Sequence, residues 1–571
     1  MRRLLTAFLA FCLPLTALGD ETPIIRYQDL RHPVLGDSGM VATQNFHASR
    51  VGSAVLADGG NAVDAAVAVG FALAVTLPRA GNLGGGGFML IHDADTGENA
   101  SIDYREMAPP GATRDMFLDE NGDVDNRLAR FSHLSAGTPG TVAGMWAAHQ
   151  RYGSMPWKRL LEPAIKLASE GVPMTYDLSA LLTNRRERLC QFEAACGYFY
   201  KDDGSAYKPG EVFKQPDLAA TLTDIAEKGP DGFYGGRVAG LIAAEMEKHG
   251  GLVDEEALAA YRPSWRVPLE GSYRGYDIVT MSPPSSGGVH VIQMLNIMEN
   301  FDVSAMGAGS ADSVHLVAES ARLAYADRSQ HLGDPDFWDV PVDWLTSKAY
   351  AKILADRIDM TRATPSESIA PGVEPRPESE DTTHYSIIDK FGNAVSNTYT
   401  LNFSFGSHIA VEGAGFLLNN EMDDFSAKPG TPNAFGLLGG EANAIEPGKR
   451  PLSSMTPTIV FADGDPWFAT GSPGGSRIIT TVLQMISNMV DHDMNLASAT
   501  AAPRIHHQWY PDRLQLEAGF SPDTAKILEE RGHFIVPSGG SMGSVQAVAI
   551  KDGVFRGASD PRRPNAESTA P

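Results

Sequence analysis

Basic residues are scarce in this sequence. The chain has 46 Lys and Arg against 70 Asp and Glu, for a formal net charge of −24, and no long basic run offsets this excess. Affinity for nucleic acid depends on Lys and Arg side chains that neutralise phosphates. A nucleic-acid partner is therefore disfavoured, whereas a small anionic substrate, which needs only one local cation, is not.

Cysteines are also few: three occur among the 571 residues. Cys12 lies in an apolar N-terminal run, which leaves Cys190 and Cys196. In an oxidising compartment this pair either closes a small disulfide loop, which we favour, or stays as two thiols. Nothing near them indicates a thiol catalyst.

Common cofactor and metal motifs are missing. The glycine-rich run 81–87 lacks the Gly-Lys-Ser/Thr ending of a P-loop, and it precedes a predicted strand instead of a helix. There is no His-Glu-x-x-His sequence and no internal repeat. We therefore expect neither a cofactor nor a metal. With 43% apolar residues, the length predicts two lobes or one large composite domain.

The N-terminus has the pattern of a secretory signal peptide. Arg2 and Arg3 precede an apolar run over 4–18, which ends in small residues. The alternative, a membrane anchor, is disfavoured because the run is short and Pro14 interrupts it. The sequence predicts a cleaved signal over 1–19, a periplasmic or secreted protein and no stable membrane anchor.

Two local patterns predict the first elements. Residues 49–56 and 61–74 are typical of helices, and the second is so apolar that we expect it to be buried in the core. Residues 88–93 and 98–105 predict a hairpin. Far along the chain, residues 361–381 are rich in Pro, Ser and Glu and predict a flexible linker.

A second hairpin follows this linker. Residues 382–389 are a β-branched and aromatic run typical of a strand, residues 393–400 would form the returning strand, and the loop between them has a glycine for its left-handed position. If Asp389 pairs with Asn393, Thr382 lies opposite Thr400, close enough for their hydroxyl groups to interact. Taken alone, the pattern favours an ordinary hairpin after an exposed loop.

A third pattern joins a strand to a helix through Ser472-Pro-Gly-Gly-Ser476. Helix 477–490 follows, and N–H groups at a helix start attract negative charge. Two further patterns suggest catalytic groups but have a better explanation. Gly539-Gly-Ser-Met-Gly543 resembles a serine-hydrolase turn but precedes a strand, so we reject it. His384 could serve as a base near Thr382, but we favour a packed histidine.

Several long segments resemble γ-glutamyltranspeptidases. They occur in the same order from about residue 30 to 560, and they are Gly81 to Leu90, Asp103-Tyr-Arg-Glu106, Thr382 to Asn402, Leu417-Leu-Asn-Asn-Glu-Met-Asp-Asp-Phe425, Arg450-Pro-Leu-Ser-Ser-Met455 and Thr470-Gly-Ser-Pro-Gly-Gly-Ser-Arg477. The resemblance implies an α/β fold of the N-terminal nucleophile hydrolases, four layers arranged αββα. It also implies self-cleavage between Asp381 and Thr382 into a large subunit, 20–381, and a small catalytic subunit, 382–571, which form a heterodimer.

The resemblance also implies the roles of individual residues. Thr382 matches the nucleophile, Thr400 the threonine that orients it, and Gly474 and Gly475 the oxyanion hole. The remaining matches are to residues that bind the γ-glutamyl group: Arg105, Ser453 and Ser454 its α-carboxylate, and Asn402, Glu421 and Asp424 its α-ammonium. The implied substrates are glutathione and other γ-glutamyl amides, with water, amino acids or peptides as acceptors.

Two rival functions stay open at this point. A cephalosporin (glutaryl) acylase would share the self-cleavage but bind an acyl chain without an α-amino group, against which Asp424, Asn402 and Glu421 argue. A non-enzymatic periplasmic binding protein would need neither the Thr382 junction nor the oxyanion turn. Its chain would stay whole.

Overall fold

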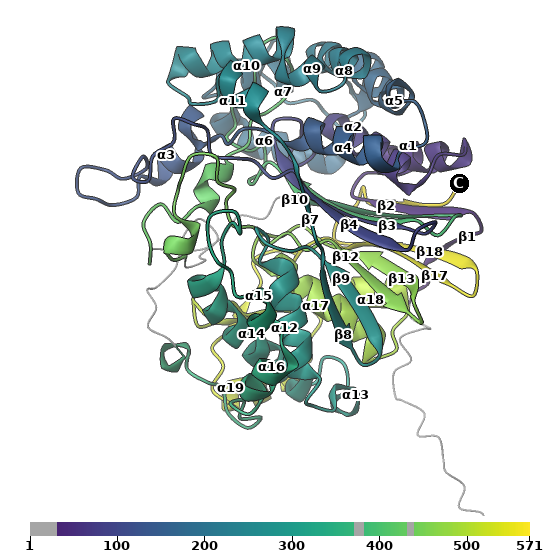
Figure 1. The fold of residues 1–571 in the computed structure, drawn as a ribbon, viewed down its shortest axis with the longest axis vertical. Helices are drawn as coiled ribbons and strands as arrows, with labels where there is room; N and C mark the ends of the chain where they lie inside the picture. Colours follow the sequence, from purple (N-terminus) through teal and green to yellow (C-terminus); the bar gives the residue numbers. More distant parts are fainter. Residues whose placement is uncertain (1–30, 370–381, 431–438) are drawn as a thin grey trace, which may run out of the picture.

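Two sheets of seven strands lie face to face at the centre of the molecule (Figure 1). The computed structural model describes residues 31–369, 382–430 and 439–571. The first sheet has the order β19 (Glu567–Thr569), β2 (Gly39–Thr43), β10 (Thr382–Asp389), β11 (Ala394–Thr400), β3 (Gly86–Asp93), β4 (Glu98–Asp103) and β7 (Ser264–Arg266). The second has the order β1 (Val34–Gly36), β18 (Val554–Ser559), β17 (Gln546–Lys551), β13 (Asp465–Thr470), β12 (Thr458–Ala462), β9 (Tyr276–Thr280) and β8 (Leu269–Tyr273).

Helices cover the outer face of each sheet (Figure 1). The layer on the first sheet contains α1 (Phe46–Ala57), α2 (Ala62–Thr76), α4 (Thr141–Tyr152), α5 (Trp157–Glu170), α8 (Pro216–Lys228) and α10 (Gly236–His249). The layer on the second contains α12 (Gly287–Met298), α14 (Ala311–His331), α17 (Arg477–Val490) and α18 (Leu496–Ala501), with α16 (Lys348–Ala355) and α19 (Pro522–Glu530) packed outside. The predicted four-layer αββα fold is confirmed.

Short elements connect and flank these layers. The helical ones are α3 (Asn126–Arg130), η2 (His133–Ser135), α6 (Tyr176–Leu189), α7 (Glu193–Phe199), α9 (Asp231–Tyr234), α11 (Glu255–Ala260), α13 (Val303–Met306), α15 (Val342–Leu345), η3 (Ser366–Ser368), η4 (Glu421–Asp424) and η5 (Glu441–Asn443). The short strands are β5 (Val172–Pro173), β6 (Val212–Phe213), β14 (Ile505–His506), β15 (Leu514–Leu516) and β16 (Ile535–Pro537).

Helix α2 is the core helix that the sequence predicted. Asn61 caps it by accepting from the Asp64 N–H, and the Asp64 carboxylate accepts in return from the Asn61 N–H, a reciprocal capping box. Every residue of α2 is buried. Within the part of the chain that the structure describes, no helix combines the length and apolarity needed to cross a membrane.

The hairpin of β10 and β11 has the predicted register. The Asp389 N–H donates to the Asn393 carbonyl oxygen at 3.0 Å, and Thr382 pairs with Thr400 at the open end. Serines on the inner face join this hairpin to the second sheet: Ser386 Oγ donates to the Gln546 carbonyl, and Ser396 Oγ donates to that of Thr470. These bonds fix the hairpin, which begins at Thr382, against the second sheet.

The predicted linker 361–381 needs a correction at its start, because Ala363 and Ser366 are buried against the body of the protein. Ser366 is buried, its hydroxyl donates to the Trp509 carbonyl at 2.6 Å, and its N–H donates to the Asp512 carboxylate at 2.8 Å. The composition of the segment did not reveal these contacts. Residues 370–381, like the predicted signal over 1–19, lie outside the described residues.

The two remaining cysteines are joined. Cys190 follows α6 and Cys196 lies in α7, and the disulfide between them closes the small loop that we favoured. The loop contains Phe192, which packs against the same hydrophobic cluster as the buried Leu189 just before the loop.

Candidate active site

Thr382 stands at the end of the first sheet, on the wall of a cavity. It is the first residue of β10, and only 7% of its surface is exposed. Opposite it, Thr400 ends β11 and its Oγ1 accepts from the Asn402 N–H at 2.8 Å. Asn402 has a left-handed backbone, with φ of 74°, and its side-chain amide donates to the Asn420 carbonyl. This turn carries the chain from the sheet to the cavity wall.

The predicted oxyanion turn lies between β13 and α17. Gly474 and Gly475 have φ of 134° and 55°, conformations that side chains with a Cβ rarely adopt. Ser472 holds the turn by accepting from the Ser544 N–H at 2.9 Å. Gly475 lines the same cavity as Thr382, so the start of α17 presents its positive dipole end there.

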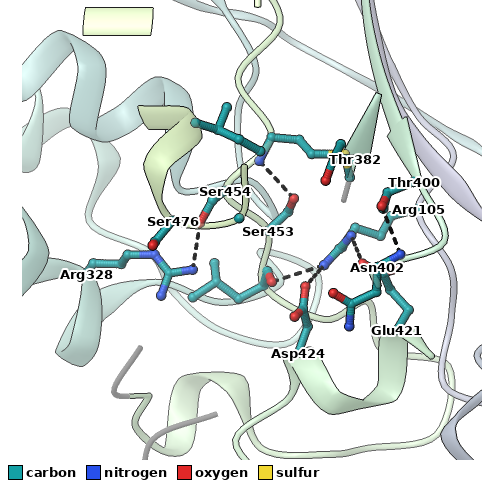
Figure 2. Close-up of a pocket in the computed structure, with 14 residues that line it drawn as sticks. Arg105, Arg328, Thr382, Thr400, Asn402, Glu421, Asp424, Ser453, Ser454 and Ser476 are labelled. Atoms are coloured by element: carbon teal, nitrogen blue, oxygen red, sulfur yellow. Dashed lines mark hydrogen bonds and ion pairs between the residues drawn. The ribbon is translucent and has the colours of Figure 1, made fainter. Parts of the chain in front are cut away.

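Arg105 lies at the centre of the polar wall. Its Nη1 donates to Glu421 Oε1 and its Nη2 to Asp424 Oδ2, each at 2.5 Å (Figure 2). Its Nε donates to the Pro451 carbonyl. Its guanidinium is only 1% exposed. The fork that we expected to face a substrate carboxylate therefore contacts two protein carboxylates from η4.

The carboxyl groups on this wall outnumber the single positive charge of Arg105. Burial, together with nearby carboxylates, raises the pKa of Glu421 well above its usual range, and burial also raises the pKa of Asp424. Burial raises the pKa of the adjacent Glu106 to about 8. Glu421 Oε2 and Asp424 Oδ1 are buried without a hydrogen-bond partner among the described residues. The wall can therefore accept hydrogen bonds from a further cation.

The opposite wall presents hydroxyl groups. Ser453 is held by its N–H, which donates to the Pro284 carbonyl, and its Oγ accepts from the Met455 N–H. Ser454 Oγ accepts from Arg328 Nη2 at 3.3 Å. Arg328 comes from α14, and its Nε also donates to Ser286 Oγ at 2.9 Å. Hydroxyl groups beside a guanidinium are suited to a carboxylate.

One cavity thus collects nearly all of the predicted residues (Figure 2). Those lining it are Arg105, Thr382, Thr400, Asn402, Glu421, Asp424, Ser453, Ser454 and Gly475. Gly474 belongs to the adjoining turn, and Asp381 lies outside the described residues. Arg328 and Ser476 also line the cavity. Sequence reasoning missed Arg328 because it stands outside every segment singled out as a motif, and it gave Ser476 no role of its own although that serine ends the turn 472–476.

Two further features bear on the chemistry. His384 is buried, its nitrogens contact the hydroxyls of Thr398 and Ser386, and burial lowers its pKa to about 3, so it is the packed histidine that we favoured. Among the described residues, the groups of side chains with metal-ligand spacing both lie outside this cavity. The rejected decoy turn precedes strand β17, as predicted.

The geometry agrees with comparisons to known proteins. The model of the gamma-glutamyltranspeptidase family matches residues 48–570. The chain belongs to this family. The gamma-glutamyltranspeptidase resemblance seen in the sequence is thereby confirmed, and with it the assignment to an enzyme family of hydrolases and transferases.

Individual relatives and solved structures support the assignment to the family. The chain is 54% identical to the glutathione hydrolase proenzyme of Escherichia coli (strain K12), over 96% of this chain and 94% of that protein. A crystal structure of Helicobacter pylori gamma-glutamyltranspeptidase is 51% identical, covers 57% of this chain and 93% of its own, and has a TM-score of 0.56. A cephalosporin acylase from Bacillus halodurans is 29% identical with a TM-score of 0.85, over 96% and 99% of the two chains.

Proposed function

We propose that this gamma-glutamyltranspeptidase family member is a precursor that cleaves itself before Thr382 and then takes γ-glutamyl groups from glutathione and related amides. Water, amino acids or short peptides would receive the group. One observation carries the proposal. Thr382 starts a strand on the wall of a cavity whose other walls offer an oxyanion turn, hydroxyl groups and buried carboxylates.

Self-cleavage accounts for the position of the nucleophile. Thr382 Oγ1 would attack the Asp381 carbonyl carbon, the peptide nitrogen would leave as an amine, and the resulting ester would be opened by water. The products would be 20–381 and 382–571, which stay together as a heterodimer because β10 pairs with β2 and β3 pairs with β11.

Cleavage also creates the base. The nitrogen of Thr382 is an amide until the bond breaks and is afterwards an α-amine, whose reference pKa is roughly 7.7–8.0. Such an amine accepts the hydroxyl proton near neutral pH. Thr400 would orient the nucleophile, and the backbone N–H groups at Gly474 and Gly475 would stabilise the oxyanion.

The polar walls fit both charged groups on the α-carbon of a γ-glutamyl group. The α-ammonium would bind the Asn402 side chain, Glu421 Oε2 and Asp424 Oδ1, two buried oxygens that have no hydrogen-bond partner among the described residues. The α-carboxylate would bind the hydroxyls of Ser453 and Ser454, with a guanidinium nearby. We propose that Arg105 acts mainly by holding the acids in place, since its fork already contacts them.

Intact mass and N-terminal sequencing test the self-cleavage. We expect two pieces in the wild type, one beginning at Thr382, and a single chain in Thr382→Ala. Thr383→Val is the matched control, because the Thr383 hydroxyl is buried and makes no hydrogen bond within the part of the chain that the structure describes. A folded wild-type chain that stays whole would overturn the mechanism and favour a binding protein.

The structural likeness to a cephalosporin acylase gives a second candidate function. The two functions differ in whether the acyl group carries an α-ammonium. Hydrolysis of γ-glutamyl-p-nitroanilide and glutaryl-p-nitroanilide by the processed protein separates them. We expect a clear preference for the γ-glutamyl compound, and preference for the glutaryl compound would reverse the assignment. Export through a signal over 1–19 remains part of the proposal, tested by the N-terminus of the large piece.

A further inference from the structure

Helix α17 follows the oxyanion turn and is hydrogen-bonded along one face to a distant segment of the chain. Ser476, which precedes the helix with a helical backbone, Thr480 and Gln484 stand four residues apart, so their side chains lie on the same side of the helix. Each of them makes a hydrogen bond to the segment 505–508, which begins with β14. We call these bonds the α17 brace. Ser476 also lines the cavity, so the brace reaches the active site (Figure 2).

Gln508 is the central residue of the brace. Its Oε1 accepts from Ser476 Oγ at 2.7 Å and lies 2.8 Å from His506 Nε2. Its Nε2 donates to the Tyr510 carbonyl at 3.1 Å. Because a carbonyl oxygen can only accept, this contact fixes which end of the amide is the nitrogen. The amide oxygen likewise only accepts, so Ser476 and His506 must both donate to it.

The protonation of His506 follows from these contacts. Its proton lies on Nε2, and its Nδ1 accepts from the Thr480 hydroxyl at 2.8 Å. Burial, followed by the nearby charge of Arg477, lowers the pKa of His506 to about 3, so the ring is neutral above that pH. Ser476, Thr480, His506 and Gln508 are all buried. Each broken bond would leave a buried polar group unpaired, which is costly, so the brace holds a single arrangement.

The backbone of the oxyanion turn is held through the same serine. The Tyr325 hydroxyl on α14 donates to the Ser476 carbonyl oxygen. Directly after Ser476, the Arg477 N–H donates back to the Gly474 carbonyl at 3.0 Å. The N–H groups of Gly474 and Gly475 therefore keep their positions only while Ser476 is held at both its side chain and its carbonyl.

We propose that Gln508 and His506 are positioning residues for the oxyanion turn and act through Ser476. The inference rests on the proposed function, because it requires that an oxyanion forms at this turn. Among the described residues that line the cavity are Ser476 and Gly475, but neither Gln508 nor His506. Donors stabilise an oxyanion best when they need not move as the charge develops. Loss of the brace should therefore slow the chemical step more than it weakens substrate binding.

Gln508→Met tests the proposal, with Gln484→Met as the matched control. Both changes replace a glutamine that joins α17 to the segment 505–508 by an apolar side chain of similar length. Gln484 exchanges two hydrogen bonds of 2.9 Å with the backbone of Ile505, two helical turns beyond Ser476. Its loss should lower the melting temperature and leave kcat close to that of the wild type.

We expect Gln508→Met to lower kcat for γ-glutamyl-p-nitroanilide by roughly 10–100-fold with little change in KM, the effect of a small misplacement at a reacting centre. Because the same turn would serve self-cleavage, kcat is expressed per mole of processed protein. Ser476→Ala should lower kcat in the same way. The double variant should be no slower than the slower single variant, because residues that act through one another are not additive.

Melting curves establish that each variant is folded, and Ser476→Ala decides the matter if Gln508→Met does not fold. With an active wild type, equal kcat in Gln508→Met and Gln484→Met would overturn the proposal. So would a double variant whose loss is the product of the two single losses, since Gln508 would then act independently of Ser476. A processed wild type that does not hydrolyse the γ-glutamyl compound would instead contradict the proposed function itself.

Discussion

Thr382 and Thr400 face each other across neighbouring strands, at the end of the sheet that borders the cavity. Strands β10 and β11 are central strands of the first sheet and are buried between the second sheet and a helical layer, so neither threonine can shift without disturbing the hairpin. The geometry places a second hydroxyl beside the proposed nucleophile.

Thr400→Val should slow both self-cleavage and substrate turnover. The change keeps the shape of the side chain but removes a hydroxyl that accepts from the Asn402 N–H and faces Thr382. We expect rates to fall by about tenfold or more, the effect of losing one well-placed hydrogen bond. Thr400→Ser should keep most of the activity. A time course of gel bands measures self-cleavage, and kcat measures turnover. Equal rates in Thr400→Val and wild type would contradict the role of Thr400 in orienting the nucleophile.

Asp424→Asn should weaken the recognition of the substrate ammonium group. The amide keeps the shape of the side chain but removes the negative charge from one buried acceptor. A hydrogen bond to a charged group contributes about 1.5–3 kcal/mol, and the variant would lose this contribution to substrate binding. We expect KM for γ-glutamyl-p-nitroanilide to rise by roughly 10–100-fold. The rate with glutaryl-p-nitroanilide should change much less. A parallel loss on both substrates would show that Asp424 acts through Arg105 and not through the ammonium.

Gly474→Ala should lower kcat with little change in KM. The residue has φ of 134°, and a Cβ there would strain the turn whose N–H groups we assign to the oxyanion. Loss of one such donor lowers kcat by about 10²–10³-fold in comparable enzymes. Gly464→Ala is the control, because Gly464 has φ of 89° in the turn between β12 and β13 and open space around it. Comparable kcat values in Gly474→Ala and Gly464→Ala would contradict the assignment of this turn to the oxyanion hole.

Arg328→Lys tests the residue that sequence reasoning missed. The guanidinium contacts Ser286 and Ser454 together, and an ammonium cannot maintain both contacts in the same geometry. We expect KM for γ-glutamyl donors to rise by about tenfold, with self-cleavage retained. Lys348→Arg, a change of the same kind at an exposed lysine, is the control for folding and stability. An unchanged KM in Arg328→Lys would show that Arg328 supports the structure and does not contribute to substrate binding.

Local features of the site could be predicted, and long-range ones could not. The register of Thr382 against Thr400 follows from the period of the strands and the length of their loop. The pairing of Arg105 with η4 joins residues more than 300 positions apart, so no local pattern contains it. Arg328 likewise reaches the cavity only because α14 packs beneath it. Ser366 is a further example. Its segment has the composition of a linker, but its hydroxyl donates to the carbonyl of Trp509, a contact between distant residues that composition cannot predict.

Glu106 should make the stability of the protein depend on pH. Its carboxyl group has a pKa of about 8 in the folded state against 4.5 for an ordinary glutamate, so the folded protein keeps a proton that the unfolded chain releases between these values. The free energy of unfolding therefore falls as the pH rises from about 4.5 to 8, by at most about 1.4 kcal/mol per pH unit.

Glu106→Gln should remove this contribution, because the neutral amide mimics the protonated acid at every pH. Chemical unfolding at pH 5, 6, 7 and 8 measures the effect. We expect the wild type to lose stability across the series more steeply than Glu106→Gln, while Glu120→Gln, which removes an exposed carboxylate, follows the wild type. If Glu106→Gln keeps the slope of the wild type, the proton must reside on Glu421 or Asp424, and the corresponding amide variants would then flatten the curve.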